Sequence, residues 1–137
     1  MKKYAEVFRK QKERGNRQIF GALYVIDDWG DRVDVLWAPF LSGRHHGCSG
    51  ILGVQKLTLV STVCRVNATG LLAFKVRNQK EYESIESEVT ALVDKHTFRE
   101  IWEEATSAPY SFLFIRSNSK SLNETFMKRF ESHFTIE

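Results

Sequence analysis

Apolar residues recur along the chain at two different spacings, and the spacing changes several times between its two ends. Alternation with a period of two indicates a strand, whereas spacings of three and four indicate a helix. Taken together, these spacings predict the order α-β-β-β-β-α-α-β-α. The expected fold class is α+β: a single domain over residues 1–137, with a largely antiparallel five-stranded sheet and helices packed mainly on one side.

The centre of the predicted sheet is residues 56–78. Two runs rich in β-branched and large apolar residues flank the sequence Asn67-Ala68-Thr69-Gly70. A short polar loop that ends in glycine is typical of an antiparallel hairpin. In the second run, an apolar series alternates with one that becomes cationic at Lys75 and Arg77. The apolar series comprises Leu72, Phe74 and Val76. We therefore expect a central hairpin with one apolar face and one face that ends in positive charge.

Three further strands are predicted. Residues 18–26 carry apolar side chains on both faces, as expected of a strand covered on both sides. After a turn at residues 27–31, residues 32–37 run back as a second strand that ends before Pro39. Residues 110–116 are again apolar on both faces, which favours an interior position in the sheet or one covered by the last helix.

Four helices are predicted, over residues 2–14, 80–95, 96–105 and 119–134. Each carries apolar side chains on one stripe. The expected inward residues of the two middle helices are Tyr82, Ile85, Val89, Leu92 and Val93, followed by Phe98, Ile101, Trp102 and Ala105. The last helix is expected to bury Leu122, Phe126, Phe130 and Phe134.

Charge is unevenly distributed although the net charge is only +3. The first 20 residues hold seven basic and two acidic side chains, whereas residues 80–104 hold three basic and eight acidic ones. Such an asymmetry can orient a protein on an anionic surface or pair it with copies of itself, although two solvated helix faces would give the same pattern. The two cysteines match no zinc or redox pattern and favour a reducing compartment. No apolar run is long enough to cross a membrane, so any membrane contact is expected to be peripheral.

The stretch over residues 39–50 contains three glycines together with His45, His46 and Cys48. A metal site is disfavoured because no carboxylate lies nearby and adjacent histidines do not readily face one ion. Cys48 could act as a nucleophile with a nearby histidine, but no family-type signature surrounds it. We expect a surface loop that orders on contact with a ligand or a neighbouring copy.

No catalytic constellation emerges from the sequence. The chain contains no glycine-rich phosphate loop, no nucleophile elbow and no paired-histidine zinc motif, and its histidines are scattered among different elements. We therefore expect a protein that is not an enzyme and that needs no cofactor.

Several short motifs resemble the small matrix proteins of non-segmented negative-strand RNA viruses, in particular those of the Borna disease virus type. The motifs are Tyr4 with Glu6, Ile26-Asp27, Pro39-Phe40-Leu41-Ser42, Lys56-Leu57-Thr58, and the run from Pro109 to Asn118 followed by Asn123 and Phe126. The likeness spans nearly the whole chain. The basic first helix and the His45-His46 loop depart from the family's pattern.

The resemblance implies a self-assembling α+β protein, commonly a tetramer, that lines the inner face of the viral envelope. It also implies peripheral membrane binding in the host cytoplasm and non-specific binding of RNA or the ribonucleoprotein during virion assembly and budding. Cations near an anionic leaflet each contribute on the order of 1 kcal/mol, and RNA phosphates are held by the same charges. The residues that would supply them are Lys2, Lys3, Arg9, Lys10, Lys12, Arg14, Arg17, Lys75 and Arg77.

A second family offers an alternative. The run Leu71 to Lys80 looks like the third strand of a restriction-endonuclease-like nuclease in which the acidic-x-lysine pair has become Lys75-x-Arg77, with Asp34 as the metal-binding aspartate. A lysine at position 75 cannot help to hold a divalent metal ion. This resemblance therefore implies a catalytically inactive nucleic-acid-binding protein.

Overall fold

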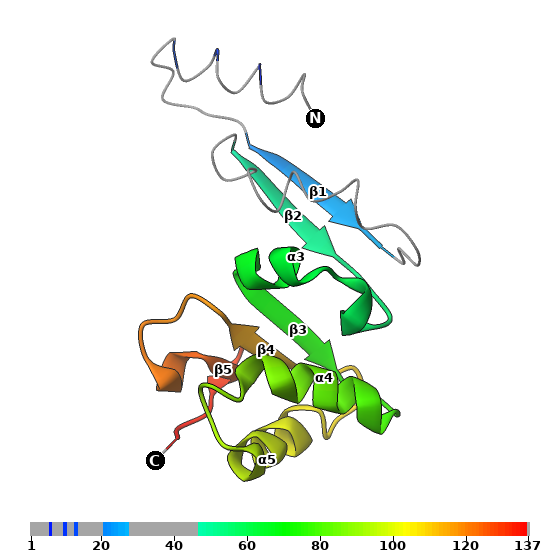
Figure 1. Cartoon of the computed structure of the whole chain (residues 1–137). Coiled ribbons are helices and arrows are strands. Elements are labelled where there is room, and N and C mark those ends of the chain that lie inside the picture. Colours follow the sequence, from blue (N-terminus) through cyan, green and yellow to red (C-terminus); the bar gives the residue numbers. More distant parts are fainter. Residues whose placement is uncertain (1–5, 7–9, 11–12, 14–20, 28–46, 137) are drawn as a thin grey trace. The chain divides into compact units, whose positions relative to one another are not determined.

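A computed structural model of the chain describes residues 6, 10, 13, 21–27 and 47–136 (Figure 1). The chain divides into two compact units, Met1–Asn67 and Ala68–Glu137, and each is described by itself. The predicted α+β class is confirmed, but the single five-stranded sheet is wrong. The described residues form a two-stranded parallel sheet in the first unit and a four-stranded antiparallel sheet in the second. A single domain over residues 1–137 stays a prediction.

The sheet of the first unit joins β1 (Ala22–Ile26) to β2 (Cys48–Leu52) in parallel, with Ala22 opposite Cys48. Gly47 enters β2 with a φ of 63°, a conformation that glycine adopts without steric cost. Its carbonyl accepts a hydrogen bond from the Ala22 N–H at 3.0 Å. The predicted irregular stretch over residues 39–50 is therefore wrong at its C-terminal end, because residues 48–50 gain a strand partner.

The predicted coverage of the first strand on both sides is also wrong for the described residues. Leu23 and Val25 are 60% and 65% exposed, whereas Ala22, Tyr24 and Ile26 are half-buried. The structure places Glu6, Lys10 and Glu13 in helical conformation, as predicted. The rest of the predicted first helix and the predicted strand over residues 32–37 lie outside the described residues.

The first half of the predicted central hairpin is helical. The 3-10 helix η3 covers Leu57–Leu59, and α3 covers Thr62–Asn67. Ser61 explains the start of α3, because its Oγ accepts a hydrogen bond from the Cys64 N–H at 3.3 Å and its carbonyl accepts one from the Arg65 N–H. These local bonds satisfy the backbone without a partner strand, and they outweigh the modest strand propensity of the β-branched residues.

The sheet of the second unit has the order β3-β4-β5-β6, and every pair is antiparallel. Its strands are β3 (Gly70–Phe74), β4 (Phe112–Arg116), β5 (Phe126–Lys128) and β6 (Ser132–His133). Phe74 lies opposite Phe112, and Ile115 lies opposite Phe126. The predicted interior position of the strand over residues 110–116 is confirmed, since β4 pairs on both sides.

Two helices join β3 to β4 (Figure 1): α4 (Gln79–Val89) and α5 (Lys95–Ala105). The predicted range of α5 is confirmed to within one residue, whereas the predicted helix over residues 80–95 is wrong at its C-terminal end, because α4 stops at Val89. Each begins after a side-chain cap, since Asn78 accepts a hydrogen bond from the Lys80 N–H and Asp94 accepts bonds from the N–H groups of His96 and Thr97. The predicted inward residues are buried except Leu92, which is 48% exposed because α4 ends three residues before it.

The core of the second unit lies between these helices and the sheet. Phe98 is 1% exposed and lies 6.3 Å from Phe126 between ring centroids. Tyr82 of α4 packs edge-on against Trp102 of α5 at 5.5 Å. Leu113 of β4 and Phe126 of β5 are fully buried. The helix α5 contacts both β4 and β5, so aromatic side chains fill the space between helices and sheet.

The predicted last helix over residues 119–134 is wrong. The segment forms a short 3-10 helix, η4 (Leu122–Glu124), and the hairpin of β5 and β6. Arg129 adopts a φ of 56° at the turn, which ends any regular helix there. β5 also supplies hydrogen-bond partners for one edge of β4, which a helix would leave unpaired. Phe126 is buried whereas Phe130 is 62% exposed, so the spacing of four did not mark one buried stripe.

The cap of α5 should give the stability a pH dependence in acid. Hydrogen bonds from Thr97 hold the pKa of Asp94 below its ordinary value. A lowered folded-state pKa means that the stabilisation is complete above the unfolded-state pKa, near 4, and is lost as the pH falls through the folded-state pKa.

We expect Asp94→Asn to keep the cap but to flatten this acid dependence in thermal unfolding. Asp94→Ala should lower the melting temperature at neutral pH as well. If the melting temperature fell equally with decreasing pH in the Asn variant and the wild type, Asp94 would not be the source of the acid dependence.

Candidate binding surface on the sheet

The sheet of the second unit has two different faces. Ala73, Leu113, Ile115 and Phe126 are buried on the face that packs against the helices. Strand residues alternate between faces, so their neighbours in sequence point the other way. We call this second surface the aromatic sheet face, and it comprises Leu72, Phe74, Phe112, Phe114, Met127 and Phe130.

The aromatic sheet face is open to solvent in spite of its apolar character. Leu72, Phe74 and Phe130 are 44%, 53% and 62% exposed. The ring of Phe130 meets Phe112 and Phe114 edge-on, with centroids 5.2 Å and 5.1 Å apart. Phe74 lies 5.2 Å from Phe112 at a tilt of 50°. These four rings form one connected cluster. Single exposed apolar side chains are common on protein surfaces, but a connected apolar patch is typical of a binding surface.

Gly70 makes room for one of these rings. A Cβ atom at this position would lie 2.5 Å from Cε2 of Phe114. Phe114 lies opposite Leu72, and its ring therefore extends diagonally over the backbone of β3 at Gly70, which has no side chain. Any larger residue at position 70 would push the ring out of the cluster.

One cation lies on this face, and two others follow the end of β3. Arg116 is exposed on the same face of β4 as Phe112 and Phe114, opposite Gly70. Lys75 and Arg77 follow the end of β3 and are exposed. Within the part of the chain that the structure describes, no acidic side chain pairs with any of these three. Arg129 is paired with Glu131.

Only some of the predicted binding residues can be placed. Lys10 forms an ion pair with Glu6 at 2.9 Å, one helical turn away. Lys75 and Arg77 stand together after β3. The other predicted cations lie outside the described residues: Lys2, Lys3, Arg9, Lys12, Arg14 and Arg17. The predicted alternation in β3 is confirmed, but the apolar series is the exposed one, because Ala73 and not Phe74 packs under the helices.

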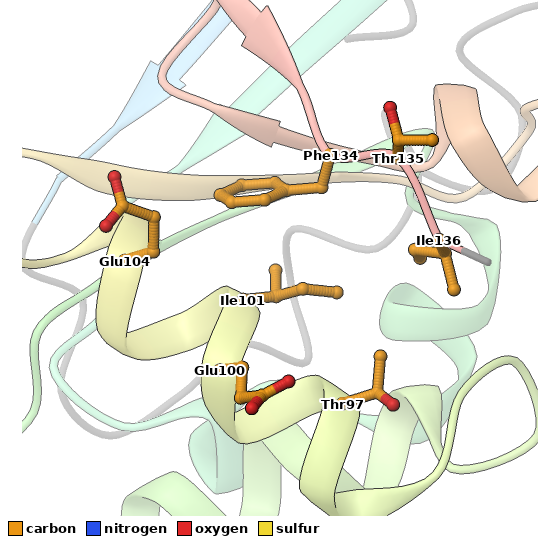
Figure 2. Close-up of a pocket in the computed structure, with 7 residues that line it drawn as sticks. All are labelled: Thr97, Glu100, Ile101, Glu104, Phe134, Thr135 and Ile136. Atoms are coloured by element: carbon orange, nitrogen blue, oxygen red, sulfur yellow. The ribbon is translucent and has the colours of Figure 1, made fainter.

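A groove runs along α5 beside the C-terminal segment (Figure 2). Its volume is about 480 Å³, and Figure 2 shows Glu100, Ile101 and Glu104 of α5 across from Phe134 and Ile136 of the C-terminal segment. The Glu104 carboxylate pairs with Lys128 Nζ at 2.6 Å. Two carboxylates on the rim disfavour an anionic ligand. The groove is therefore not where RNA or a lipid phosphate would bind.

A polar cluster with buried members on α4 and exposed members on α5 joins the two helices. Glu86 is only 7% exposed, and its carboxylate lies 3.7 Å from Lys95 Nζ. Burial raises the pKa of Tyr82, with Glu86 acting in the same direction and Arg99 opposing it. The phenol therefore stays neutral at physiological pH and is not a general base. This cluster holds α4 against α5 rather than facing a ligand.

The described residues contain no group of three or more histidine, cysteine, aspartate or glutamate side chains placed to hold a metal ion. None of the helices among them is long and apolar enough to span a membrane. Cys48 is half-buried and Cys64 is buried, and no disulfide joins them. His45, His46 and Asp34 lie outside the described residues, so the loop and nuclease hypotheses stay predictions.

Comparisons with known proteins do not place the chain in a family. No protein-family model, curated protein or solved structure matches it. The functional argument therefore rests on the residues themselves.

Proposed function

We propose that this protein is a non-enzymatic viral matrix protein that assembles with copies of itself beneath a membrane. In this role it binds anionic phospholipid and, without sequence preference, RNA or ribonucleoprotein. The family resemblance of the sequence motivates the proposal. One structural observation supports its binding part: in the second unit the exposed cation Arg116, which pairs with no acidic side chain among the described residues, lies on the same sheet face as the exposed rings.

Two sets of cations would share the binding of anions. The first is the basic segment within residues 1–20, where seven basic side chains outnumber two acidic ones. The second is the pair Lys75 and Arg77, which follows Phe74 in the sequence. One copy offers only a few such charges, each worth about 1 kcal/mol near an anionic leaflet. Assembly would add these weak contacts, because binding of linked copies becomes effectively intramolecular.

The first experiment is the solution mass by light scattering over a range of concentrations, combined with flotation on vesicles. A defined oligomer, with a tetramer expected, should float with vesicles that contain phosphatidylserine at low salt and detach at high salt. Vesicles of phosphatidylcholine alone are the control. A monomer that ignores acidic lipid would refute the proposal.

Lys75 and Arg77 provide a smaller test of the same function. Replacing both by alanine should weaken binding to acidic vesicles roughly 10- to 30-fold at low salt, because about 2 kcal/mol of charge attraction is lost. The melting temperature should change little, since both side chains are exposed. Vesicle binding titrated at two salt concentrations measures the effect. Equal affinities for variant and wild type would remove these two residues from the site.

A further inference from the structure

We propose that the aromatic sheet face is a platform on which bases of single-stranded RNA stack. The inference rests on the RNA binding in the proposed function and assigns it a site. It also adds a second kind of contact, because base stacking does not depend on phosphate neutralisation.

The geometry of the rings suits stacking. Bases bind to sheets by lying against exposed aromatic side chains, each of which contributes affinity for one base regardless of its identity. Phe74 on β3 and Phe130 after β5 are the two most exposed rings of the face, and both touch Phe112 of β4. The cluster thus reaches across three strands, with an exposed ring at each side of a shared one.

The ring cluster is also held in place. Phe112 and Phe114 belong to the central strand β4, which pairs on both sides. The space above Gly70 accepts the edge of the Phe114 ring. Phe130 lies in the turn after β5, where its ring contacts both Phe112 and Phe114. Rings that are already positioned in the free protein lose less conformational entropy when a ligand binds.

The distribution of charge favours a polyanion on this face. Arg116 lies on it, beside the rings of β4, and can reach a phosphate or stack on a base. The opposite layer is acidic, since residues 80–104 of α4 and α5 carry eight carboxylates against three basic side chains. An approaching RNA would be repelled from the helices and attracted to the sheet.

A second copy of the chain is the competing occupant of this face. Packing two such faces together would cover the rings, but it would also place the Arg116 guanidinium in an interface where the carboxylate next to Phe130, that of Glu131, is already paired with Arg129. Burying an unpaired cation is costly. RNA satisfies both parts of the surface, because it brings bases for the rings and phosphates for the arginine.

The test compares binding of labelled single-stranded RNA, the same strand without bases, and the RNA duplex by fluorescence anisotropy. Phe74→Leu and Phe130→Leu keep apolar side chains but remove the rings. Tyr110→Leu is the matched control, since Tyr110 is 95% exposed, lies before β4 and takes part in none of the described ring contacts of the face. Light scattering and thermal unfolding accompany each variant.

The wild type should bind single-stranded RNA about 10-fold or more tighter than the abasic strand. The double variant Phe74→Leu/Phe130→Leu should lose most of this difference and bind the abasic strand and the duplex as the wild type does. Tyr110→Leu should behave as the wild type. Each single variant should lose part of the difference, so the result does not depend on the folding of the double variant.

Three outcomes would overturn the inference. Equal binding of base-bearing and abasic strands by the wild type would remove stacking but leave phosphate binding, and so the proposed function, intact. Loss of the oligomer in the leucine variants without RNA would identify the face as a contact between copies. Absence of any RNA binding by the wild type would overturn both the platform and the RNA part of the proposed function, while vesicle flotation would still test the membrane part.

Discussion

Replacing Phe126 by alanine is expected to lower the free energy of unfolding by about 3–5 kcal/mol. Phe126 is fully buried, packs against Phe98 of α5 and lies opposite Ile115 on β4. Truncation would leave a cavity between helix and sheet that the neighbouring strand and helix cannot easily fill. Chemical denaturation monitored by tryptophan fluorescence measures the change, because Trp102 lies in the same core.

Phe130→Ala is the matched control for this experiment. The same substitution four residues away should cost less than about 1 kcal/mol, because Phe130 is 62% exposed and its ring lies on the open face. If residues 119–134 formed one helix with a buried phenylalanine stripe, both substitutions would be similarly damaging. Comparable losses at the two positions would therefore contradict the hairpin of β5 and β6.

Reversing the charge of Lys10, Lys12 and Arg14 to glutamate is expected to reduce binding to phosphatidylserine vesicles at low salt by on the order of 100-fold or more. Each cation contributes about 1 kcal/mol near an anionic leaflet, and each reversal adds repulsion to that loss. The fold should be retained, as circular dichroism would show, because the one described residue of the three, Lys10, is exposed and makes only an i,i+4 ion pair with Glu6. Flotation measures the binding.

A control with the same net charge separates local from global electrostatics. Lys56, Lys80 and Lys120 are exposed lysines outside the first 20 residues. Their combined replacement by glutamate changes the net charge by the same amount. If both triple variants detach equally, vesicles respond to overall charge and the basic N-terminal segment is not a specific site.

The helices of the second unit could be predicted because local signals agree with their surroundings there. Asn78 and Asp94 mark the starts, and apolar residues at helical spacing meet the core. Likewise, residues 110–116 are so apolar that only a strand paired on both sides suits them.

The segments that were predicted incorrectly are those in which local chemistry and tertiary pairing compete. Residues 57–67 look like a strand by composition, yet Ser61 starts α3 instead. Residues 119–134 carry phenylalanines at helical spacing, yet the need of β4 for a second hydrogen-bonding partner selects β5. Apolar residues at helical spacing indicate that a helix with one apolar side is possible. Whether a helix or a strand forms also depends on which backbone hydrogen-bond partners are available.

In the candidate site, too, local patterns were informative and tertiary packing could not be predicted. The alternation of apolar and cationic residues after Leu71 marks Lys75 and Arg77, whereas the apolar pattern predicts an interior position for Phe112, Phe114 and Phe130. Their spacing does carry a signal, because Phe112 and Phe114 alternate with the buried Leu113 and Ile115. Which series faces the helices is decided by where α5 packs, and a single sequence does not contain that information.

The connection between β3 and β4 has a consequence for how the second unit folds. These strands are neighbours in the sheet, but α4 and α5 lie between them in the chain. β5 and β6, by contrast, are joined by a tight turn. Pairing β3 with β4 closes a long segment, and the loss of chain entropy precedes the hydrogen bonds that offset it. The helices and the β5–β6 hairpin, in contrast, can form from local contacts. β3 should therefore be the last strand to join the sheet and the first to leave it, and its departure would carry Phe74 away from Phe112 while Phe130 stays in place.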